Sequence, residues 1–333
     1  MKVRLLIQNE NICEVYKNLP YMKNMNVFQS KFYFDVLKSS KQTRPYLLVA
    51  EEDNKITGIA LIQIQNYFSS ILRNFSSRSI ISGGPLFRDD GITLTELLTA
   101  YYKYFNKSVV YTQVRNIFNL ESYDYIFEKY NFRRIGHLNY LIDLEEDIDV
   151  IWGNVYSKRK NEIRKGVKDG IKVKEISYDS ELNKAYKILE LIYKKAKLPF
   201  PSYNYFDNTR KVDNGDEIIR IFGGYLDDEL IGVMFLLCFN GRVYNWYAGS
   251  NPVYYKKYPN DVITWEAIKW ASESGYKIFD FGGAGNPDIK YGVREYKKKF
   301  GGAEINYGRY ESIHKPFVMK VSNYGFKLWQ KFK

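Results

Sequence analysis

Residues 279–302, FDFGGAGNPDIKYGVREYKKKFGG, combine a glycine-rich turn with five basic side chains. Gly282 and Gly283 follow the apolar run IFDF, which predicts a loop at the end of a β-strand. Backbone N–H groups of such a loop can surround an anion, and nearby lysines can neutralise a phosphate or a developing oxyanion. The alternative is a tight turn whose glycines adopt positive φ and bind nothing. Both interpretations stay open.

Several catalytic mechanisms are excluded by what the sequence lacks. His137 and His314 are the only histidines, which nearly excludes His-based triads and multi-His metal sites. Cys13 and Cys238 are too far apart for a CxxC site, and Cys238 lies in the apolar run VMFLLCF, which predicts a buried thiol. There is no G-x-S-x-G, P-loop or G-x-G-x-x-G pattern. No metal or cofactor is expected, and the remaining equipment suits a transfer reaction in which the substrate brings its own reactive group.

The net charge of +12 predicts an anionic partner, which could be RNA, a nucleotide-linked substrate or a membrane surface. The N-terminal apolar run is shorter than the roughly 7–15 residues of a signal peptide. No apolar stretch approaches the ~20 residues that span a bilayer. We therefore expect a cytoplasmic protein.

A weak internal repeat predicts the elements that position these residues. Tyr46–Gln65 and Ile218–Phe239 each read as strand, acidic turn and strand, with Gly58 and Gly232 in matching places. Each hairpin is followed by a helical pattern, TLTELLTAYYKYF or DVITWEAIKWASESG, and then by a strand pattern, VVYTQV or IFDF. The alternative is that no duplication occurred, because any two hairpins look alike. The fold class predicted is α/β, with two domains that each hold a mixed sheet flanked by helices. Asn260 or Asp261 is the expected N-cap of the second helix, and Gly275 its end.

Predicted domains cover residues 1–148 and 149–312, followed by a basic aromatic helix over 313–333. A second basic helix is predicted over 157–168, and it either faces solvent or contacts phosphates. The segment 315–333 holds five lysines and no acid. It is either an interfacial helix at an anionic membrane or a terminal helix packed on the second domain.

An ordered set of motifs resembles the Fem family of peptidyltransferases (FemA, FemB, FemX) and related GNAT-fold acyltransferases of polysaccharide gene clusters. The motifs are FQSKFYFDVLK, GGPLF, GHLNYLIDL, KRKNEIRKGVKDGIKV, YNWYAGS, PNDVITWEAIKWA and residues 279–302. The resemblance implies two tandem GNAT-like domains. It also implies transfer of an amino acid from aminoacyl-tRNA to an amine of a peptidoglycan precursor. Because residues 166–218 lack sustained heptads, the compact FemX type without a coiled-coil insertion is expected.

The same resemblance implies roles for individual residues. Tyr296 and Lys297 match a pair that serves the tRNA end and the transfer step, and are the predicted catalytic residues. Lys38 matches a lysine that holds the precursor's phosphates. The predicted substrate-binding set is Lys38, Tyr205, Tyr247, Gly282, Gly283 and Arg294. One departure concerns LPFPSYNYF, where Pro201 lies near the place of an arginine that grips the nucleotide-linked precursor in FemX. The acceptor therefore stays open between a nucleotide-linked, a lipid-linked and another amino-sugar or peptide molecule.

The predicted reaction is acyl transfer to an amine through a tetrahedral intermediate, without a covalent enzyme step. Asp280 is either a general base or a carboxylate that caps loop amides. No [QR]-x-x-G-x-[GA] pyrophosphate loop is present, which favours a tRNA donor over acyl-CoA. An acyl-CoA-dependent N-acyltransferase acting on an amino sugar is the alternative function, and a non-enzymatic binder of RNA or a membrane surface is the third. The predicted partners of this monomer are tRNA and a cell-wall or polysaccharide precursor, with membrane contact through 315–333 at the inner face.

Overall fold

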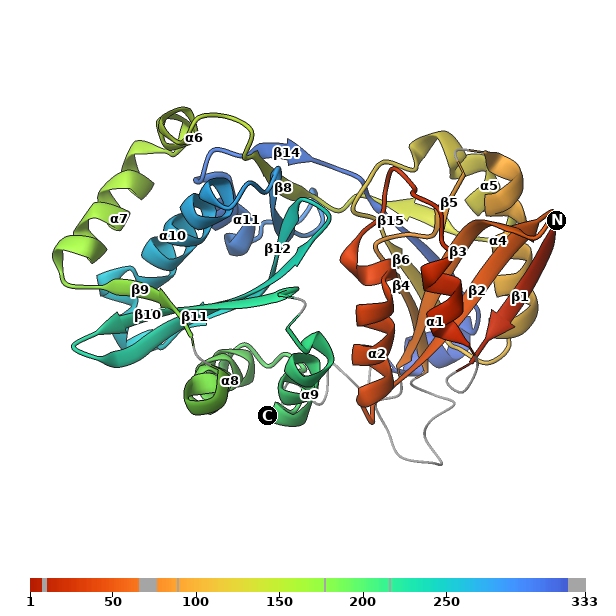
Figure 1. The fold of residues 1–333 in the computed structure, drawn as a ribbon, viewed down its shortest axis with the longest axis horizontal. Helices are drawn as coiled ribbons and strands as arrows, with labels where there is room; N and C mark the ends of the chain where they lie inside the picture. Colours follow the sequence, from red (N-terminus) through yellow and green to blue (C-terminus); the bar gives the residue numbers. More distant parts are fainter. Residues whose placement is uncertain (8–10, 66–76, 89, 177, 216, 323–333) are drawn as a thin grey trace. The chain divides into compact units, whose positions relative to one another are not determined.

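A computed structural model describes residues 1–7, 11–65, 77–88, 90–176, 178–215 and 217–322. The chain forms two compact units (Figure 1). The first contains Met1–Gly136 and Tyr307–Lys333, and the second contains His137–Asn306. Within the described ranges, the first unit has an eight-stranded sheet and the second a seven-stranded sheet.

The first sheet has the strand order β1-β2-β3-β4-β6-β15-β7, and β5 pairs with β3 at its side. β4 and β6 pair in parallel, whereas the other pairs described for this sheet are antiparallel. Its strands are β1 (Lys2–Leu6), β2 (Thr43–Glu52), β3 (Lys55–Gln65), β4 (Arg78–Ser82), β5 (Leu86–Phe87), β6 (Tyr111–Arg115), β7 (Arg133–Ile135) and β15 (Arg309–Ile313).

The second sheet has the order β9-β10-β11-β12-β13-β8-β14, with β12 and β13 in parallel. Its strands are β8 (Asn139–Asp143), β9 (Lys172–Glu175), β10 (Ile219–Leu226), β11 (Glu229–Phe239), β12 (Arg242–Ser250), β13 (Ile278–Gly283) and β14 (Ala303–Ile305). Each strand of this order corresponds to the strand at the same position of the first sheet, and the parallel pair lies at the fourth and fifth positions in both. The expected pair of tandem GNAT-like domains is therefore confirmed.

The two halves of the chain exchange their last strands. β8 follows β7 in sequence but pairs with β13 and β14, and β15 follows β14 but pairs with β6 and β7. Each of these strands fills the sixth place of the other half's sheet. The predicted domains 1–148 and 149–312 assign β8 and β15 to the opposite units, because sequence order alone does not reveal long-range pairing.

The repeated hairpins end in the same kind of turn. Asp53 and Asn54 in the first unit have φ of 50° and 61°, and Asp227 and Asp228 in the second have 47° and 64°. Positive φ at both central residues is the type I′ turn, whose twist suits a two-residue hairpin. The predicted acidic turn between two strands is therefore confirmed in both units.

The matching glycines have a common packing reason. Gly58 pairs with Ala50 and Gly232 pairs with Gly224, each beside a register shift in the neighbouring strand. A Cβ at Gly58 would lie 2.7 Å from the Thr93 methyl, and one at Gly232 would lie 2.8 Å from Ile263. Thr93 and Ile263 belong to the helices that cross each sheet, so only glycine allows this close approach.

Helices cover both faces of each sheet. In the first unit α4 (Gly91–Phe105) packs on β1, β2 and β3, and α2 (Lys31–Ser39) packs on β2. In the second unit α10 (Pro259–Glu273) packs on β10, β11 and β12, and α8 (Tyr178–Lys195) packs on β11 and β12. Further helices of the described residues are α1 (Ile12–Lys17), α5 (Asp124–Lys129), α6 (Ile148–Asn154), α7 (Ser157–Lys168), α9 (Tyr203–Asp213), α11 (Gly292–Lys298) and residues 316–322, with short 3₁₀ turns η1 (Val27–Gln29), η2 (Glu121–Tyr123) and η3 (Pro252–Lys257).

Helix ends follow the sequence signals only in part. α10 stops before Gly275, which has φ of 77° as expected for a helix end. Its predicted N-cap is wrong: Tyr258 caps the helix in the left-handed region, Pro259 follows, and Asp261 lies in the first turn. Asp261 is buried and forms an ion pair with Arg159 of α7. Packing against α7 therefore fixes this end of the helix.

Two further predictions concern features outside the sheets. Between Gly166 and Ile218 the described residues form the end of α7, strand β9 and the helices α8 and α9. These described residues contain no coiled-coil insertion. In the predicted C-terminal helix, residues 323–333 lie outside the described ones, including Leu328, Trp329 and Phe332. Among the described helices, none combines the length and apolar composition that crossing a membrane needs.

Candidate functional site

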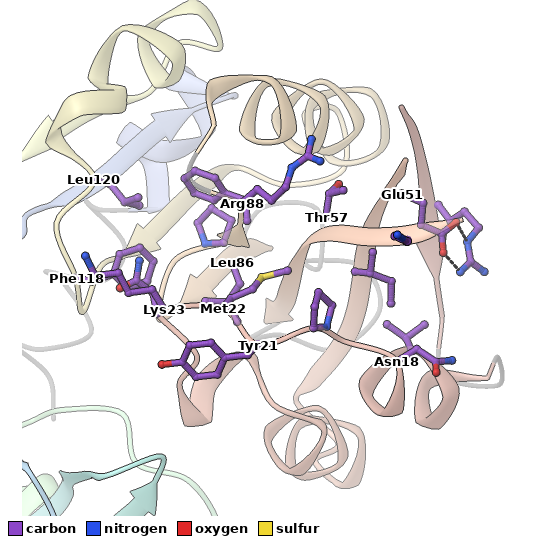
Figure 2. A pocket seen from close by; sticks show the side chains of 18 of the residues that line it. Asn18, Tyr21, Met22, Lys23, Glu51, Thr57, Leu86, Arg88, Phe118 and Leu120 are labelled. Carbon is purple, nitrogen blue, oxygen red and sulfur yellow. Dashed lines mark hydrogen bonds and ion pairs between the residues drawn. The ribbon is translucent and has the colours of Figure 1, made fainter. Parts of the chain in front are cut away.

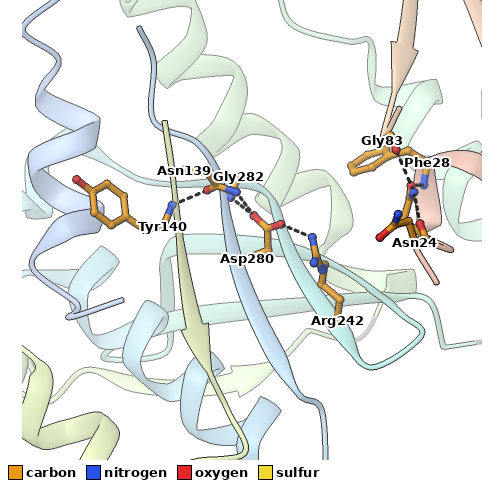
Figure 3. Close-up of polar contacts among 9 residues, drawn as sticks. Asn24, Phe28, Gly83, Asn139, Tyr140, Arg242, Asp280 and Gly282 are labelled. Carbon is orange, nitrogen blue, oxygen red and sulfur yellow. Dashed lines mark hydrogen bonds and ion pairs between the residues drawn. The ribbon is translucent and has the colours of Figure 1, made fainter. Parts of the chain in front are cut away.

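Asp280 anchors the glycine loop at the end of β13. Its side chain is 0% exposed. The carboxylate accepts hydrogen bonds from the Asn139 side chain at 2.6 Å and from the Gly282 N–H at 2.8 Å, and it pairs with Arg242 at 3.1 Å (Figure 3). With both oxygens occupied and no exposed edge, this carboxylate is placed to cap the loop, whereas a general base must reach its substrate.

The loop backbone is used within the protein. Gly282 has φ of 69°, and a Cβ there would lie 3.0 Å from the Tyr244 hydroxyl, so this position requires glycine. The Gly282 N–H donates to Asp280, and the Ala284 N–H donates to the Leu138 carbonyl at 2.6 Å. Gly283 ends β13 opposite Asn139. These contacts favour the tight-turn interpretation over an anion-binding nest at Gly282 and Ala284.

Lys297, on α11, holds the opposite edge of the loop. Its Nζ donates to the carbonyls of Phe281 at 2.6 Å, Gly282 at 3.2 Å and Gly283 at 2.9 Å. Burial lowers the pKa of Lys297 to about 8, against the opposing effect of the Asp280 charge. All three ammonium hydrogens are therefore directed at the loop, and a carboxylate and an ammonium hold it from two sides.

Tyr296 points elsewhere, although it precedes Lys297 in sequence. Its hydroxyl lies 2.9 Å from the Thr264 hydroxyl and donates to the Asn260 carbonyl at 3.0 Å. The Arg159 guanidinium lies over its ring at 4.5 Å. Burial raises the pKa of Tyr296 to about 12, partly offset by the Arg159 charge. The phenol is therefore protonated near neutral pH, and it ties α11 to α10.

Arg294 fixes the segment that follows the glycines. Its guanidinium donates to the carbonyls of Ala284 at 3.1 Å, Pro287 at 3.0 Å and Ile289 at 3.0 Å, and also to that of Asn286. A fork of N–H donors in one plane suits several carbonyls of one turn. Residues 284–289 are therefore wrapped around one side chain.

Tyr205 and Tyr247 belong to an aromatic cluster of α8, α9 and β12. The Tyr205 ring lies 5.6 Å from that of Trp246, and the Tyr247 ring lies 5.2 Å from that of Phe206. Both tyrosines are half-buried, so each keeps part of its surface accessible. The ring contacts within this cluster involve Tyr186, Tyr193, Phe200, Tyr203, Tyr205, Phe206, Phe235, Trp246 and Tyr247.

The structure brings part of the predicted set together. Gly282, Gly283 and Lys297 meet directly, and Arg294 holds the adjoining turn. Lys38 is an exposed residue of the last turn of α2, which belongs to the first unit. Sequence reasoning missed the side chains that hold Asp280 at the start of the loop, namely Asn139 and Arg242. Asn139 and Arg242 reach Asp280 through the pairing of β13 with β8 and β12, which sequence order does not reveal.

A separate pocket of 1430 Å³ lies in the first unit (Figure 2). Residues that follow the parallel strands β4 and β6 line it, together with α1, residues 18–24 and the β2–β3 turn. Lys23 and Lys55 line this pocket and form no ion pair with other described residues. Several separate segments contribute, which explains why no sequence motif marks it. Asn18, Asn54 and Phe118 also line it.

Comparison with known proteins fits this architecture. A family model described as an acetyltransferase (GNAT) domain matches residues 157–298. A crystal structure of FemX covers 96% of this chain and 99% of its own, with a TM-score of 0.73 and 12% identity. The chain has the Fem type of tandem GNAT fold. The predicted resemblance to the Fem family is therefore confirmed.

Two other comparisons cover different shares of the chain. The UDP-N-acetylmuramoylpentapeptide-lysine N(6)-alanyltransferase of Weissella viridescens is 24% identical over 195 residues, which are 55% of this chain. The match spans 56% of that relative's length. A tandem GNAT protein from the clavulanic acid biosynthesis pathway aligns over 94% of this chain and 99% of its own, with a TM-score of 0.59 and 10% identity.

Proposed function

We propose that this Fem-type chain transfers an aminoacyl group from aminoacyl-tRNA to an amine of a peptidoglycan-type precursor. The fold of FemX over nearly the whole chain and the similarity to an alanyltransferase support the reaction class. The choice of donor rests on one observation: the chain's own carboxylates lie at the N-terminal ends of the two helices that follow β4 and β12. Because a helix N-terminus attracts anions, these ends are where GNAT enzymes hold the pyrophosphate of CoA.

In the second unit, the start of α10 is filled by the protein itself. Tyr258 adopts φ of 62°, and Pro259 brings no N–H to the first turn. Asp261 supplies a negative charge in that turn, where Arg159 pairs with it. The preceding residues form η3 instead of a glycine loop. A pyrophosphate would have to displace these contacts.

In the first unit, Asp90 caps α4. Its carboxylate accepts from the Thr93 N–H at 2.6 Å and pairs with Arg88 at 2.8 Å. Burial favours the neutral acid, but these hydrogen bonds outweigh burial and lower the pKa of Asp90. The carboxylate is therefore charged at neutral pH, and it would repel a second anion at the same helix end. Both helix ends therefore support the proposal of aminoacyl-tRNA over acyl-CoA as the donor.

Lys297 is the cation that we place at the transfer step. Its ammonium positions the loop through three carbonyls, and release of one carbonyl would provide a donor for the tetrahedral oxyanion. Tyr296 contributes by fixing α11, since its hydroxyl is engaged with α10. The acceptor amine attacks the ester carbonyl of the donor, and the tRNA hydroxyl leaves with the proton that the amine loses. Because aminoacyl-tRNA is intracellular, this proposal also places the chain in the cytoplasm.

A second candidate is an acyl-CoA-dependent N-acyltransferase acting on an amino sugar. The match of residues 157–298 to an acetyltransferase domain favours it. A comparison of donors separates the two candidates, with purified protein, envelope precursors as acceptors, and either labelled aminoacyl-tRNA or labelled acetyl-CoA. We expect label from aminoacyl-tRNA alone. Label from acetyl-CoA alone would replace our proposal by the second candidate, and label from neither would favour the non-enzymatic binder.

A further inference from the structure

α7 concentrates positive charge on one face of the second unit. The helix covers Ser157–Lys168 and lies along α10 (Figure 1). Its inner face is buried through Arg159, Ile163 and Gly166. A Cβ at Gly166 would lie 2.5 Å from Val262 and 2.9 Å from the Lys257 carbonyl, so the two helices approach closely. This packing determines which side chains face outward.

Four of the outward side chains of α7 are basic. Lys158, Arg164, Lys165 and Lys168 are exposed, and none of these four forms an ion pair with another described residue. We call them the α7 stripe. At 1.5 Å per residue it extends for about 15 Å along the helix.

The nearby carboxylates do not neutralise the stripe. Glu162 pairs with buried Arg159 at 3.1 Å, and Asp169 pairs with Lys257 at 3.2 Å. Two cations of the stripe are also oriented by aromatic rings, because Arg164 lies 5.5 Å from the Trp152 ring and Lys165 lies 5.4 Å from the Tyr258 ring. The stripe therefore offers four cations, two of them partly ordered, without a local counter-charge.

We propose that the α7 stripe binds the phosphate backbone of RNA, as the docking surface for the donor tRNA. This inference rests on the proposed function. A row of lysines and arginines without acids is the electrostatic pattern of phosphate binding. An interfacial membrane helix would in addition need an exposed apolar face, whereas Val167 is the one large apolar side chain that α7 exposes and its inner face is buried against α10. RNA is therefore the partner that this surface fits.

The test uses uncharged tRNA, so that it does not depend on transfer. Fluorescence anisotropy measures its affinity over a series of KCl concentrations. The test variant changes Lys158, Arg164, Lys165 and Lys168 to Gln. The matched control changes four exposed lysines of α8 to Gln, namely Lys184, Lys187, Lys194 and Lys195, which also form no ion pair with described residues. Both variants lose the same net charge.

We expect the α7 variant to weaken binding at least about tenfold in 0.1 M salt and to lower the salt slope by about 2–4, since each phosphate contact contributes about one. The α8 control should stay within about twofold of the natural chain. Equal losses in both variants, or none in the α7 variant, would overturn the inference. So would an α7 variant that keeps tRNA affinity but loses binding to vesicles of anionic phospholipid.

A folding control and a comparison with transfer activity separate loss of the surface from other causes. Circular dichroism checks folding, and the milder double change of Lys158→Gln with Lys168→Gln replaces the test variant if the latter does not fold. If the α7 variant loses tRNA affinity but the natural chain shows no transfer activity, the result supports the binding surface and rejects the proposed function. Normal transfer and tRNA binding in the α7 variant would reject the surface alone.

Discussion

The two sheets have the same strand order, but the segments that follow their parallel strands, β4 with β6 and β12 with β13, use charged side chains differently. After β4 and β6 in the first unit, the chain lines an open pocket in which Lys23 and Lys55 have no ion-pair partner among the described residues. After β13 in the second unit, Asp280, Lys297 and Arg294 bind the loop itself. The same strand order thus carries two arrangements of cations: in the first unit they have no ion-pair partner among the described residues, and in the second they hold a backbone segment in place.

The largest effect should follow the loss of Asp280. Asp280→Ala leaves Arg242, the Asn139 amide and the Gly282 N–H without their buried acceptor, so we expect about 3–5 kcal/mol less stability. Urea unfolding followed by tryptophan fluorescence reports on the second unit, where Trp152, Trp246, Trp265 and Trp270 lie. Asp288→Ala, at an exposed position of the same loop, is the control. A loss below about 1 kcal/mol would show that the loop does not depend on this carboxylate.

Lys297→Met should have the next largest effect on stability. The variant removes three hydrogen bonds to loop carbonyls, and we expect a loss of about 2–3 kcal/mol in the same urea experiment. Lys298→Met removes an exposed neighbouring charge and should change stability by less than about 0.5 kcal/mol. Similar values for the two variants would contradict the bracing role.

The pH dependence of the free energy of unfolding also tests the role of Lys297. Because burial lowers the pKa of Lys297 to about 8, the native state binds fewer protons than the unfolded state between about pH 8 and 10.5. The free energy of unfolding of the natural chain should therefore rise over this window relative to that of Lys297→Met. An NMR titration of the Lys297 side chain measures the pKa directly. A midpoint near 10.5 would show that the three carbonyls and Asp280 compensate fully for burial.

Arg294→Gln should have a smaller effect. It removes the contacts that wrap residues 284–289, which lie nearer the surface, so we expect a loss of about 1–2 kcal/mol. Hydrogen exchange should accelerate in residues 284–291 and stay unchanged in β12. Exchange that is uniform across the second unit would instead indicate a global loss of stability.

The smallest effect is expected in the first unit. Lys23→Ala together with Lys55→Ala should change the stability of the chain by less than about 0.5 kcal/mol, because neither ammonium has an ion-pair partner among the described residues. Thermal unfolding by circular dichroism measures this. A loss comparable to that of Lys297→Met would remove the contrast between the two strand ends.

Local signals predicted much of this fold. The hairpin turns, the basic helix over 157–168 and the end of α10 at Gly275 all follow from residues close in sequence. The exchange of β8 and β15 does not, since short strands carry little pattern and their partners lie far along the chain. The same limit applies to the loop, where Asn139 and Arg242 reach Asp280 only through strand pairing. Tyr296 and Lys297 point to different places because neighbouring residues of a helix do not share a face, and the helix α11 was not among the elements predicted from the sequence.

The most direct test of the central claim, that transfer occurs beside the loop held by Lys297, is a single-turnover measurement with labelled aminoacyl-tRNA and an envelope precursor. Lys297→Met and Lys298→Met are compared with the natural chain at equal folded concentration. We predict a loss of at least about a hundredfold for Lys297→Met, the scale of removing one oxyanion donor, and less than about twofold for Lys298→Met. Equal rates for the two variants would contradict the account.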